Sequence, residues 1–300
     1  MKSFFVLRDR RPLSRRRLAA FAAFLAVAAF ARDVAAQEAL PPAAVARDAQ
    51  AQEALPPAAE VVRNVNAREQ GRSMSQRMAV ALIDRDGSRR ERGMVVFRRR
   101  TEDEAQTVMF FTSPASIDGT GLLVRDYDEA GRDDGLWLYL PAMRSVRRIA
   151  GGGRGEEFFG TDFTLFEVST DTRLRDDLLT FEVTAAETIE GAACIRLLAR
   201  PSSEKLAREL GYGHADYWID RAAWVPRRID LRDTAGKLLK EVRFDDIRQV
   251  AGIWTVHRRS ARDAGDGRRT IFETTDVRYD VDVPASLFTE SGLSHGPPRR

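Results

Sequence analysis

Cysteine and histidine are scarce in this sequence, which excludes several kinds of chemical site. Its 300 residues include one cysteine, Cys194, and three histidines, His214, His257 and His295. A single cysteine cannot form an internal disulfide or a CxxC motif. The histidines show no HExxH or other metal-ligand spacing, so no ordinary zinc site is expected. Cys194 lies between apolar residues, and we interpret it as a small buried side chain rather than a reactive thiol.

Sequence patterns of catalysis are also missing. No GxSxG nucleophile elbow occurs, and the glycine run at 151–155 continues into Glu156-Glu157 instead of the Lys-Ser/Thr of a phosphate-binding loop. Carboxylate pairs such as Asp133-Asp134 could act as a general acid and base. In a chain of which 31% is charged, however, such pairs are expected on solvated surfaces. The sequence thus predicts a protein that is not an enzyme and that needs no cofactor and no metal.

The N-terminal region lacks a run long enough for a membrane-spanning helix, because its apolar stretch covers only 13 residues, 18–30, and a span needs about 20. Six arginines precede this stretch, and Val34-Ala35-Ala36 follows it. That order is typical of a cleaved secretory signal. We predict a signal peptide over residues 1–36 and a periplasmic protein without a lipid-anchor cysteine. The export route, Sec or twin-arginine, stays open, and an uncleaved anchor is the alternative.

The positive charge of the whole chain belongs to this predicted leader. Of 48 basic and 45 acidic residues, eight basic and two acidic ones lie within 1–36, which leaves 40 basic and 43 acidic residues. The sequence pI of 9.2 is therefore no indication of nucleic-acid binding.

Residues 37–59 are rich in alanine and proline, and the segment 36–44 recurs at 51–59. We expect a disordered spacer there, with a partner-binding tail as the alternative.

Short strands joined by short turns fill most of the remaining chain. Asp86-Gly87 is a strong signal for a two-residue hairpin, and Glu190-Gly191 and Ala251-Gly252 are weaker turn candidates. Short connections require antiparallel neighbours, since parallel strands need long crossovers. We therefore predict one mostly antiparallel β domain with a few short helices over residues 60–293, followed by a disordered tail at 294–300.

Three short helices are expected in this domain. Valines recur at helical spacing in residues 61–65, in a segment that ends near Gly71. Residues 164–167, Thr-Leu-Phe-Glu, have the spacing of a capping box. The Ser-Ser-Glu sequence that begins the segment 202–210 opens another helix, which we expect to end at Gly211.

The strands of the two halves of the domain differ. In the C-terminal half, apolar residues such as Ile229 and Leu231 alternate with charged ones, which indicates one buried and one wet face. In the N-terminal half, the segments 108–111 and 136–140 are apolar at every position. Their second face must be covered by a helix, by another sheet or by a hydrophobic ligand.

Several motifs that occur in order along the chain resemble those of a known family. They are FFTSP (110–114), GTGLL (119–123), WLYLP (137–141), RRI (147–149), FFGTDF (158–163), YWID (217–220), GKLLK (236–240) and LFT (287–289). Together they resemble the LolA-like outer-membrane lipoprotein-sorting proteins, from about Ala67 to Leu293. The resemblance implies a half-open, incomplete antiparallel β-barrel closed by a helical lid, with an apolar space that holds acyl chains. It also implies a monomer that carries lipid or lipoprotein cargo. The donor would be an inner-membrane exporter and the recipient an outer-membrane acceptor.

Candidate residues for cargo binding are the large apolar side chains of these motifs. They are Phe110, Leu122, Trp137, Tyr139, Phe158, Phe159, Phe163 and Phe166. The segment 158–166 would be the lid or the floor of the cavity, although its aromatic residues would equally suit a plain core.

Two further groups of candidates lie beside these motifs. The basic residues that interleave with apolar ones, and that could form a rim for a head group or a partner, are Arg144, Arg147 and Arg148. A solvated strand end is the alternative for them. The glycines that could form the hinge of the lid are Gly151, Gly152 and Gly153.

Two other functions compete with a lipid carrier. A periplasmic adaptor or sensor could use the same fold with its concavity filled by side chains. A lipid-modifying hydrolase would need a converging set of acid, base and nucleophile. Cavity volume discriminates between carrier and adaptor, since pockets for ligands of this kind measure roughly 300 Å³ or more.

Overall fold

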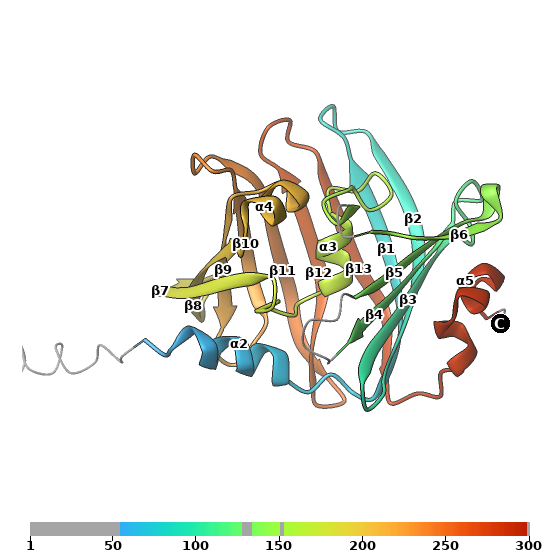
Figure 1. Ribbon diagram of the computed structural model, residues 1–300, viewed down its shortest axis with the longest axis horizontal. Coiled ribbons are helices and arrows are strands. Elements are labelled where there is room, and N and C mark those ends of the chain that lie inside the picture. Colours follow the sequence, from blue (N-terminus) through green and yellow to red (C-terminus); the bar gives the residue numbers. More distant parts are fainter. Residues whose placement is uncertain (1–54, 128–133, 151–152, 299–300) are drawn as a thin grey trace, which may run out of the picture. The chain divides into compact units, whose positions relative to one another are not determined.

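The computed structural model of the protein describes residues 55–127, 134–150 and 153–298 (Figure 1). Within these ranges thirteen strands form a single sheet whose neighbouring strands are all antiparallel. The strands are β1 (Ser73–Ile83), β2 (Arg89–Arg100), β3 (Glu104–Ser113), β4 (Gly121–Tyr127), β5 (Gly135–Leu140), β6 (Ser145–Arg148), β7 (Leu179–Ile189), β8 (Ala192–Pro201), β9 (His214–Asp220), β10 (Pro226–Arg232), β11 (Leu238–Val250), β12 (Ile253–Asp263) and β13 (Arg269–Tyr279). The predicted signal peptide and most of the predicted spacer lie outside the described residues.

The order of the strands explains why the sheet stays open. It is β6-β5-β4-β3-β2-β1-β13-β12-β11-β10-β9-β8-β7, so the first and last strands pair in the middle. The chain therefore winds outward to one edge, crosses to the other edge and winds back. The edge strands β6 and β7 do not pair with each other, and the curved sheet has a concave face (Figure 1). The predicted mostly antiparallel, half-open barrel is confirmed.

Two hairpins have tight two-residue turns. The φ angles are 50° and 84° at Glu190-Gly191, and 51° and 82° at Ala251-Gly252. Positive φ at both positions is the type I′ turn, whose twist matches the flanking strands. Asp86-Gly87, predicted as the clearest two-residue turn, instead lies in the longer connection 84–88. There the Asp86 carboxylate accepts the N–H of Ser88 at 2.9 Å, a side-chain hydrogen bond that stabilises the wider turn.

The helices of the described ranges are short. They are α2 (Ala58–Ala67), α3 (Leu165–Thr170), α4 (Glu204–Leu210) and α5 (Glu290–His295), with single 3₁₀ turns η1 (Pro141–Met143) and η3 (Ala285–Phe288). α3 has the predicted capping box: Thr164 Oγ1 accepts the N–H of Glu167 at 3.2 Å, and the Glu167 carboxylate accepts the N–H of Thr164 at 2.7 Å. α4 ends at Gly211 as predicted, whereas α2 ends ahead of Gly71. None of the described helices is long and apolar enough to cross a membrane.

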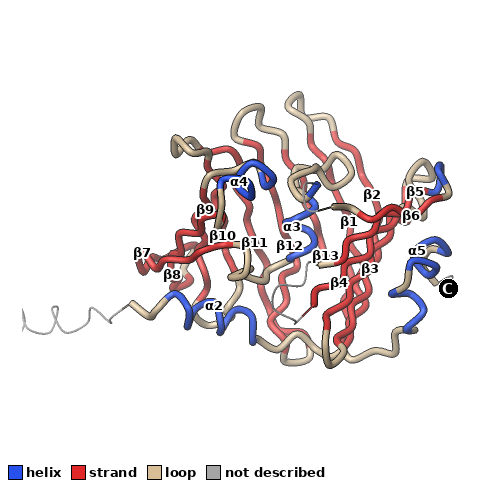
Figure 2. The backbone as a smooth tube through the Cα atoms, viewed as in Figure 1, coloured by secondary structure: helices blue, strands red, loops and turns tan. Residues whose placement is uncertain are grey.

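The segment that leads from β6 to β7 crosses the concave face and carries α3 (Figures 1 and 2). We call its described residues 153–178 the crossing segment. Aromatic rings hold it on the sheet: Phe158 stacks on Phe111 at a centroid distance of 5.6 Å, and Phe163 lies 4.8 Å from Phe272. These aromatic residues therefore belong to the main core.

Polar contacts fix the crossing segment further. Lys240 Nζ on β11 donates to Glu167 of α3 at 2.6 Å and to the carbonyl oxygen of Asp162 at 2.9 Å. The hydroxyl of Thr270 on β13 donates to the Asp162 carboxylate at 2.8 Å. The N-terminal end of α3 is thus tied to two strands that are distant in sequence.

The outer face of the N-terminal strands is covered by the C-terminal segment 284–295. Val108 and Phe110 of β3 point outward and pack with η3 and α5, while Met109 and Phe111 point to the concave face. The covering residues are buried, and they are Leu287, Phe288 and Leu293. Of the three covers that the sequence left open for these strands, a helix is the one observed. α5 ends at His295, just inside the tail predicted from residue 294.

The outer face of the C-terminal strands carries a ladder of arginines and carboxylates. The buried Asp230 accepts from Arg228 at 2.7 Å and from Arg232 at 3.2 Å. The Trp218 ring lies between the guanidinium groups of Arg196 and Arg228, at 5.2 and 4.9 Å. The predicted alternation of an apolar inner and a charged outer face is confirmed for these strands.

Candidate functional site

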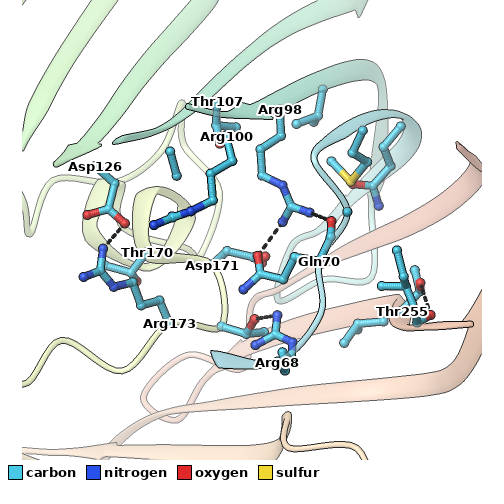
Figure 3. Close-up of a pocket in the computed structure, with 18 of the residues that line it drawn as sticks. Arg68, Gln70, Arg98, Arg100, Thr107, Asp126, Thr170, Asp171, Arg173 and Thr255 are labelled. Atoms are coloured by element: carbon cyan, nitrogen blue, oxygen red, sulfur yellow. Dashed lines mark hydrogen bonds and ion pairs between the residues drawn. The ribbon is translucent and has the colours of Figure 1, made fainter. Parts of the chain in front are cut away.

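A cavity of about 1010 Å³ lies on the concave side of the sheet (Figure 3). Its walls come from β1–β4, β12 and β13, from the segment 66–72, which comprises the end of α2 and its connection to β1, and from residues 168–173 of the crossing segment. Pockets for small organic ligands measure roughly 300–1,000 Å³. The cavity is therefore large enough for an apolar chain together with a polar group.

The sheet side of this cavity is apolar and rich in methionine. The methionines that line it are Met74, Met78, Met94 and Met109, all buried. They occupy inward positions on β1, β2 and β3, next to Val96 and Phe272. Methionine is flexible and polarizable, so this wall can adapt to apolar chains of different shape.

Arginines gather at the opposite end, where the segment 66–72 meets the crossing segment (Figure 3). Arg98 donates to the side-chain oxygen of Gln70 at 2.7 Å and to the carbonyl oxygen of the same residue. Arg68 donates to the hydroxyl of Thr172. Burial lowers the pKa of both Arg68 and Arg98, because the charged guanidinium groups are removed from bulk water. We refer to Arg68, Arg98 and Arg259 as the arginine cluster.

Asp171, at the end of α3, is the counter-charge of the arginine cluster. Its carboxylate lies 2.7 Å from a guanidinium nitrogen of Arg259. Burial in the protein opposes ionisation of this carboxyl, but the positive charges of Arg259, Arg68 and Arg98 outweigh it and hold its pKa below the usual range. The side chain is nevertheless 44% exposed, because it faces the cavity. Its backbone, with φ 52° and ψ −109°, is in a conformation that non-glycine residues rarely adopt.

The cavity lining as a whole is electropositive. Its arginines are Arg63, Arg68, Arg72, Arg98, Arg100, Arg173 and Arg259, and its carboxylates are Glu69, Glu102, Asp126 and Asp171. Arg173 forms an ion pair with Asp126 across the cavity wall (Figure 3). Seven positive charges against four negative ones favour an anionic group inside the cavity.

Three of the eight predicted cargo-binding residues lie on the outer face of the sheet. Phe110, Trp137 and Tyr139 pack with the C-terminal segment 284–295 and do not line the cavity. The alternation of β3 explains this position, since Met109 points into the cavity and its neighbour must point away. Cargo binding by these three residues stays a prediction.

The other five lie on the concave side. Leu122, Phe158 and Phe159 belong to the main core, and Phe163 and Phe166 line a small void of about 30 Å³ on the other side of the residues that follow α3. These side chains pack in the core with the crossing segment, but none of them lines the large cavity. Their contact with cargo also stays a prediction.

The predicted basic rim lies at the edge of the sheet. Arg144, Arg147 and Arg148 are exposed on and beside the edge strand β6 and do not line the cavity. The guanidinium group of Arg148 lies over the Trp137 ring, 5.6 Å from its centroid. Their position is that of a charged strand end, and a role in head-group or partner binding stays a prediction.

The remaining predicted residues have varied positions. Gly151 and Gly152 lie outside the described residues, and the half-buried Gly153 donates its N–H to the carbonyl oxygen of Ala150 at 2.9 Å. A hinge at these glycines stays a prediction.

Cys194 is buried as expected, and burial raises the pKa of its thiol. Among the described side chains, no three of His, Cys, Asp and Glu gather into a group that could hold a metal.

The residues that dominate the polar end of the cavity were not predicted as a site. For Arg98 the sequence contains a signal, because the inward series that begins at Met94 places it on the apolar face with period 2. A charge on such a face requires a partner or a ligand. Arg68, Asp171 and Arg259 follow no local pattern, since the fold brings them together from three distant segments.

Comparisons with known proteins agree with this architecture. A family model described as an uncharacterized protein matches residues 103–295, which is more than half of the chain. Among curated proteins none matches the sequence.

Three solved structures illustrate the likeness in fold. A proposed outer membrane lipoprotein-sorting protein domain from Vibrio parahaemolyticus is 23% identical, with a TM-score of 0.71 over 79% of this chain and 98% of that one. A DUF1329 family protein from Desulfovibrio piger is 23% identical, with a TM-score of 0.71 over 78% and 96%. A LolA superfamily protein from Nitrosomonas europaea is 17% identical, with a TM-score of 0.60 over 79% and 99%.

The incomplete barrel of this chain thus has the same fold as these three structures. Each likeness covers nearly the whole of the compared structure, although identity is low. The chain belongs to the family matched over residues 103–295, and its domain has the LolA-like fold of outer membrane lipoprotein-sorting proteins.

Proposed function

We propose that this protein is a soluble periplasmic carrier that binds the acyl chains of a lipid or lipoprotein and passes them toward the outer membrane. The observation that carries this proposal is the cavity of about 1010 Å³ with a methionine-rich wall. Each methylene group removed from water contributes about 0.8 kcal/mol, so an acyl chain does not cross an aqueous space unaided. An apolar cavity wall lowers that barrier.

The same observation favours a carrier over an adaptor or sensor. An adaptor with this fold would need no internal space, and side chains would fill its concavity. Here four buried methionines line an open cavity. A protein interior is normally packed with few voids larger than a water molecule, so a cavity of this size supports a role in binding a ligand.

The proposed location in the periplasm depends on the N-terminal sequence. An arginine-rich start, a short apolar run and a small-residue site at 34–36 form a secretory leader. An inner-membrane exporter as donor and an outer-membrane acceptor are the partners that such a carrier requires. We also propose that the crossing segment 153–178 acts as the lid, since it spans the opening between the two free edges of the sheet.

The first test is native mass spectrometry with lipid extraction. The full-length chain, expressed with its leader and purified from the host periplasm, is expected to carry a lipid or an acylated peptide in stoichiometric amount. A ligand-free mass, unchanged after incubation with membrane vesicles, would overturn the carrier proposal and favour the adaptor.

A matched pair of substitutions tests whether this cavity is the binding site. Met109→Trp fills part of the cavity with a larger side chain and is expected to reduce the bound lipid severalfold. Met143→Trp makes the same change at a residue that is 50% exposed outside the cavity, and it should leave lipid content unchanged. Thermal unfolding by circular dichroism establishes that both variants are folded.

A further inference from the structure

The arginine cluster has fewer counter-charges than its three guanidinium groups require. Asp171 is the only carboxylate among the described residues that is seen to pair with Arg259, and it also interacts with Arg68 and Arg98. Glu69 adds a further negative charge that acts on Arg98, so two carboxylates face three positive charges at the end of the cavity. In the absence of further anions, such a site attracts a negatively charged group from solution.

Two donors of this cluster also lack hydrogen-bond partners. Arg68 Nε and Arg259 Nε are buried atoms without an acceptor in the described part of the chain. Buried polar groups are nearly always hydrogen-bonded, so an unpaired donor beside the cavity marks a position where a ligand atom can bind once a neighbouring side chain moves away. Arginine offers a planar fork of donors that matches the oxygens of phosphate and carboxylate groups.

Asp171, whose carboxylate pairs with the arginine cluster, has a strained backbone conformation. Asp171 has a φ of 52°, and such a conformation in a non-glycine residue costs free energy that its surroundings must supply. Residues 170–173 form the wall between the large cavity and the small void of about 30 Å³, because they line both. Movement of this short stretch would relieve the strain and would join the two spaces.

We propose that the cavity selects amphiphiles with an anionic head group, whose oxygens bind the arginine cluster in exchange for the Asp171 carboxylate. The apolar chain of the ligand then lies along the methionine-rich wall, next to the cluster. Asp171 acts as a built-in counter-ion that stabilises the empty protein and leaves when a head group arrives, since two anions at one site repel each other. The inference deepens the proposed carrier function and rests on it.

The test compares two fluorescent lipids with the same acyl chains. Phosphatidylglycerol provides an anionic head group, and phosphatidylcholine provides a zwitterionic one. Binding to the purified full-length chain, stripped of endogenous lipid, is measured by fluorescence titration. The wild-type protein is expected to bind phosphatidylglycerol about tenfold more tightly, which is the contribution of one charge-assisted hydrogen bond.

Substitutions in the cluster should move this preference in opposite directions. Asp171→Asn removes the internal counter-ion at constant size, and it is expected to tighten phosphatidylglycerol binding severalfold without a matching change for phosphatidylcholine. Arg98→Gln should weaken phosphatidylglycerol binding about tenfold and phosphatidylcholine binding less, because the choline ammonium group offsets the charge of its phosphate. Arg248→Gln, at an arginine 62% exposed on β11, is the matched control and should change neither. If Arg98→Gln does not fold, Arg98→Lys, which keeps the charge but not the fork, should give a smaller weakening in the same direction.

The outcomes separate this inference from the carrier proposal. Failure of both lipids to bind the wild-type protein would overturn the carrier function and the head-group site together. Equal binding of both lipids to all variants would overturn the head-group site alone, and so would weaker phosphatidylglycerol binding by Asp171→Asn. Inorganic phosphate at the lipid's concentration is expected not to compete, and effective competition would assign the cluster to a free oxyanion instead of a lipid.

Discussion

The outer faces of the two halves of the sheet are stabilised in different ways. In β3, β4 and β5 the outer face is apolar, and the C-terminal segment 284–295 covers it. In β8–β11 the outer face carries arginines and carboxylates that pair both along β10 and between neighbouring strands. Both halves turn an apolar face to the same concave core.

The difference shows what each kind of strand requires from the rest of the chain. An apolar outer face needs a cover from elsewhere, and its stability depends on a tertiary contact. A charged outer face is satisfied by neighbouring strands, because cross-strand ion pairs form wherever the register is correct. The N-terminal half is therefore the one that should fail when the C-terminal segment is damaged.

The largest expected effect is the loss of a buried aromatic ring from that cover. Phe288→Ala should lower the free energy of unfolding by about 3–5 kcal/mol, because the ring is fully buried against the outer face. Urea denaturation measures the change. Met143→Ala, at a residue 50% exposed, is the control and should stay within about 0.5 kcal/mol of the wild type. A loss for Phe288→Ala as small as the control's would show that this segment does not stabilise the N-terminal half.

A smaller effect is expected for the charged outer face. Asp230→Ala removes the buried carboxylate between Arg228 and Arg232 and should cost about 1–3 kcal/mol. Both arginines keep a second carboxylate partner and partial exposure, which limits the loss. Glu190→Ala, at a carboxylate 54% exposed and paired with Arg243, is the matched control and should change stability by about 1 kcal/mol or less. Equal effects of the two substitutions would contradict the importance of burial in this ladder.

The smallest expected effect is on the pH dependence of the free energy of unfolding, through Asp220 in the C-terminal half. Burial opposes ionisation of Asp220, but hydrogen bonds from Ala223, Arg227 and Ala222 outweigh it and lower its pKa. Because folding lowers this pKa, the carboxylate stabilises the folded state fully above the unfolded value of about 3.9, and the contribution is lost as pH falls through the folded value.

Asp220→Asn should accordingly reduce the free energy of unfolding at pH 7 by about 1–3 kcal/mol, and the difference from the wild type should shrink below about pH 4. Unfolding by urea at a series of pH values checks this. A difference that stays constant down to pH 3 would mean that the charge of Asp220 contributes nothing to stability.

Much of the local structure could be predicted from residue patterns. The capping box at Thr164 and Glu167, the end of α4 at Gly211 and the alternation around Ile229 depend on neighbours within a few residues. The predicted two-residue turn at Asp86-Gly87 was wrong. A hydrogen bond from the N–H of Ser88 to the Asp86 carboxylate favours a wider turn than the dipeptide suggests.

The candidate site was harder to predict than the fold. Hydrophobicity singled out aromatic residues such as Phe110 and Phe158, and the structure places both in packed clusters outside the cavity. Composition cannot distinguish an apolar residue in a core from one that faces open space. The cavity is lined instead by methionines on the sheet and by arginines that the sequence had indicated only as abundant charge.

The sequence by itself determined the strands, their antiparallel pairing and the need to cover an apolar second face, because these follow from period 2 and from short connections. Only the tertiary structure decided that the C-terminal segment provides the cover and that Arg68, Arg98, Asp171 and Arg259 meet. These residues come from four separate parts of the chain. The crossing of the chain from β6 to β7 brings Asp171 to the arginines, and no local pattern records that contact.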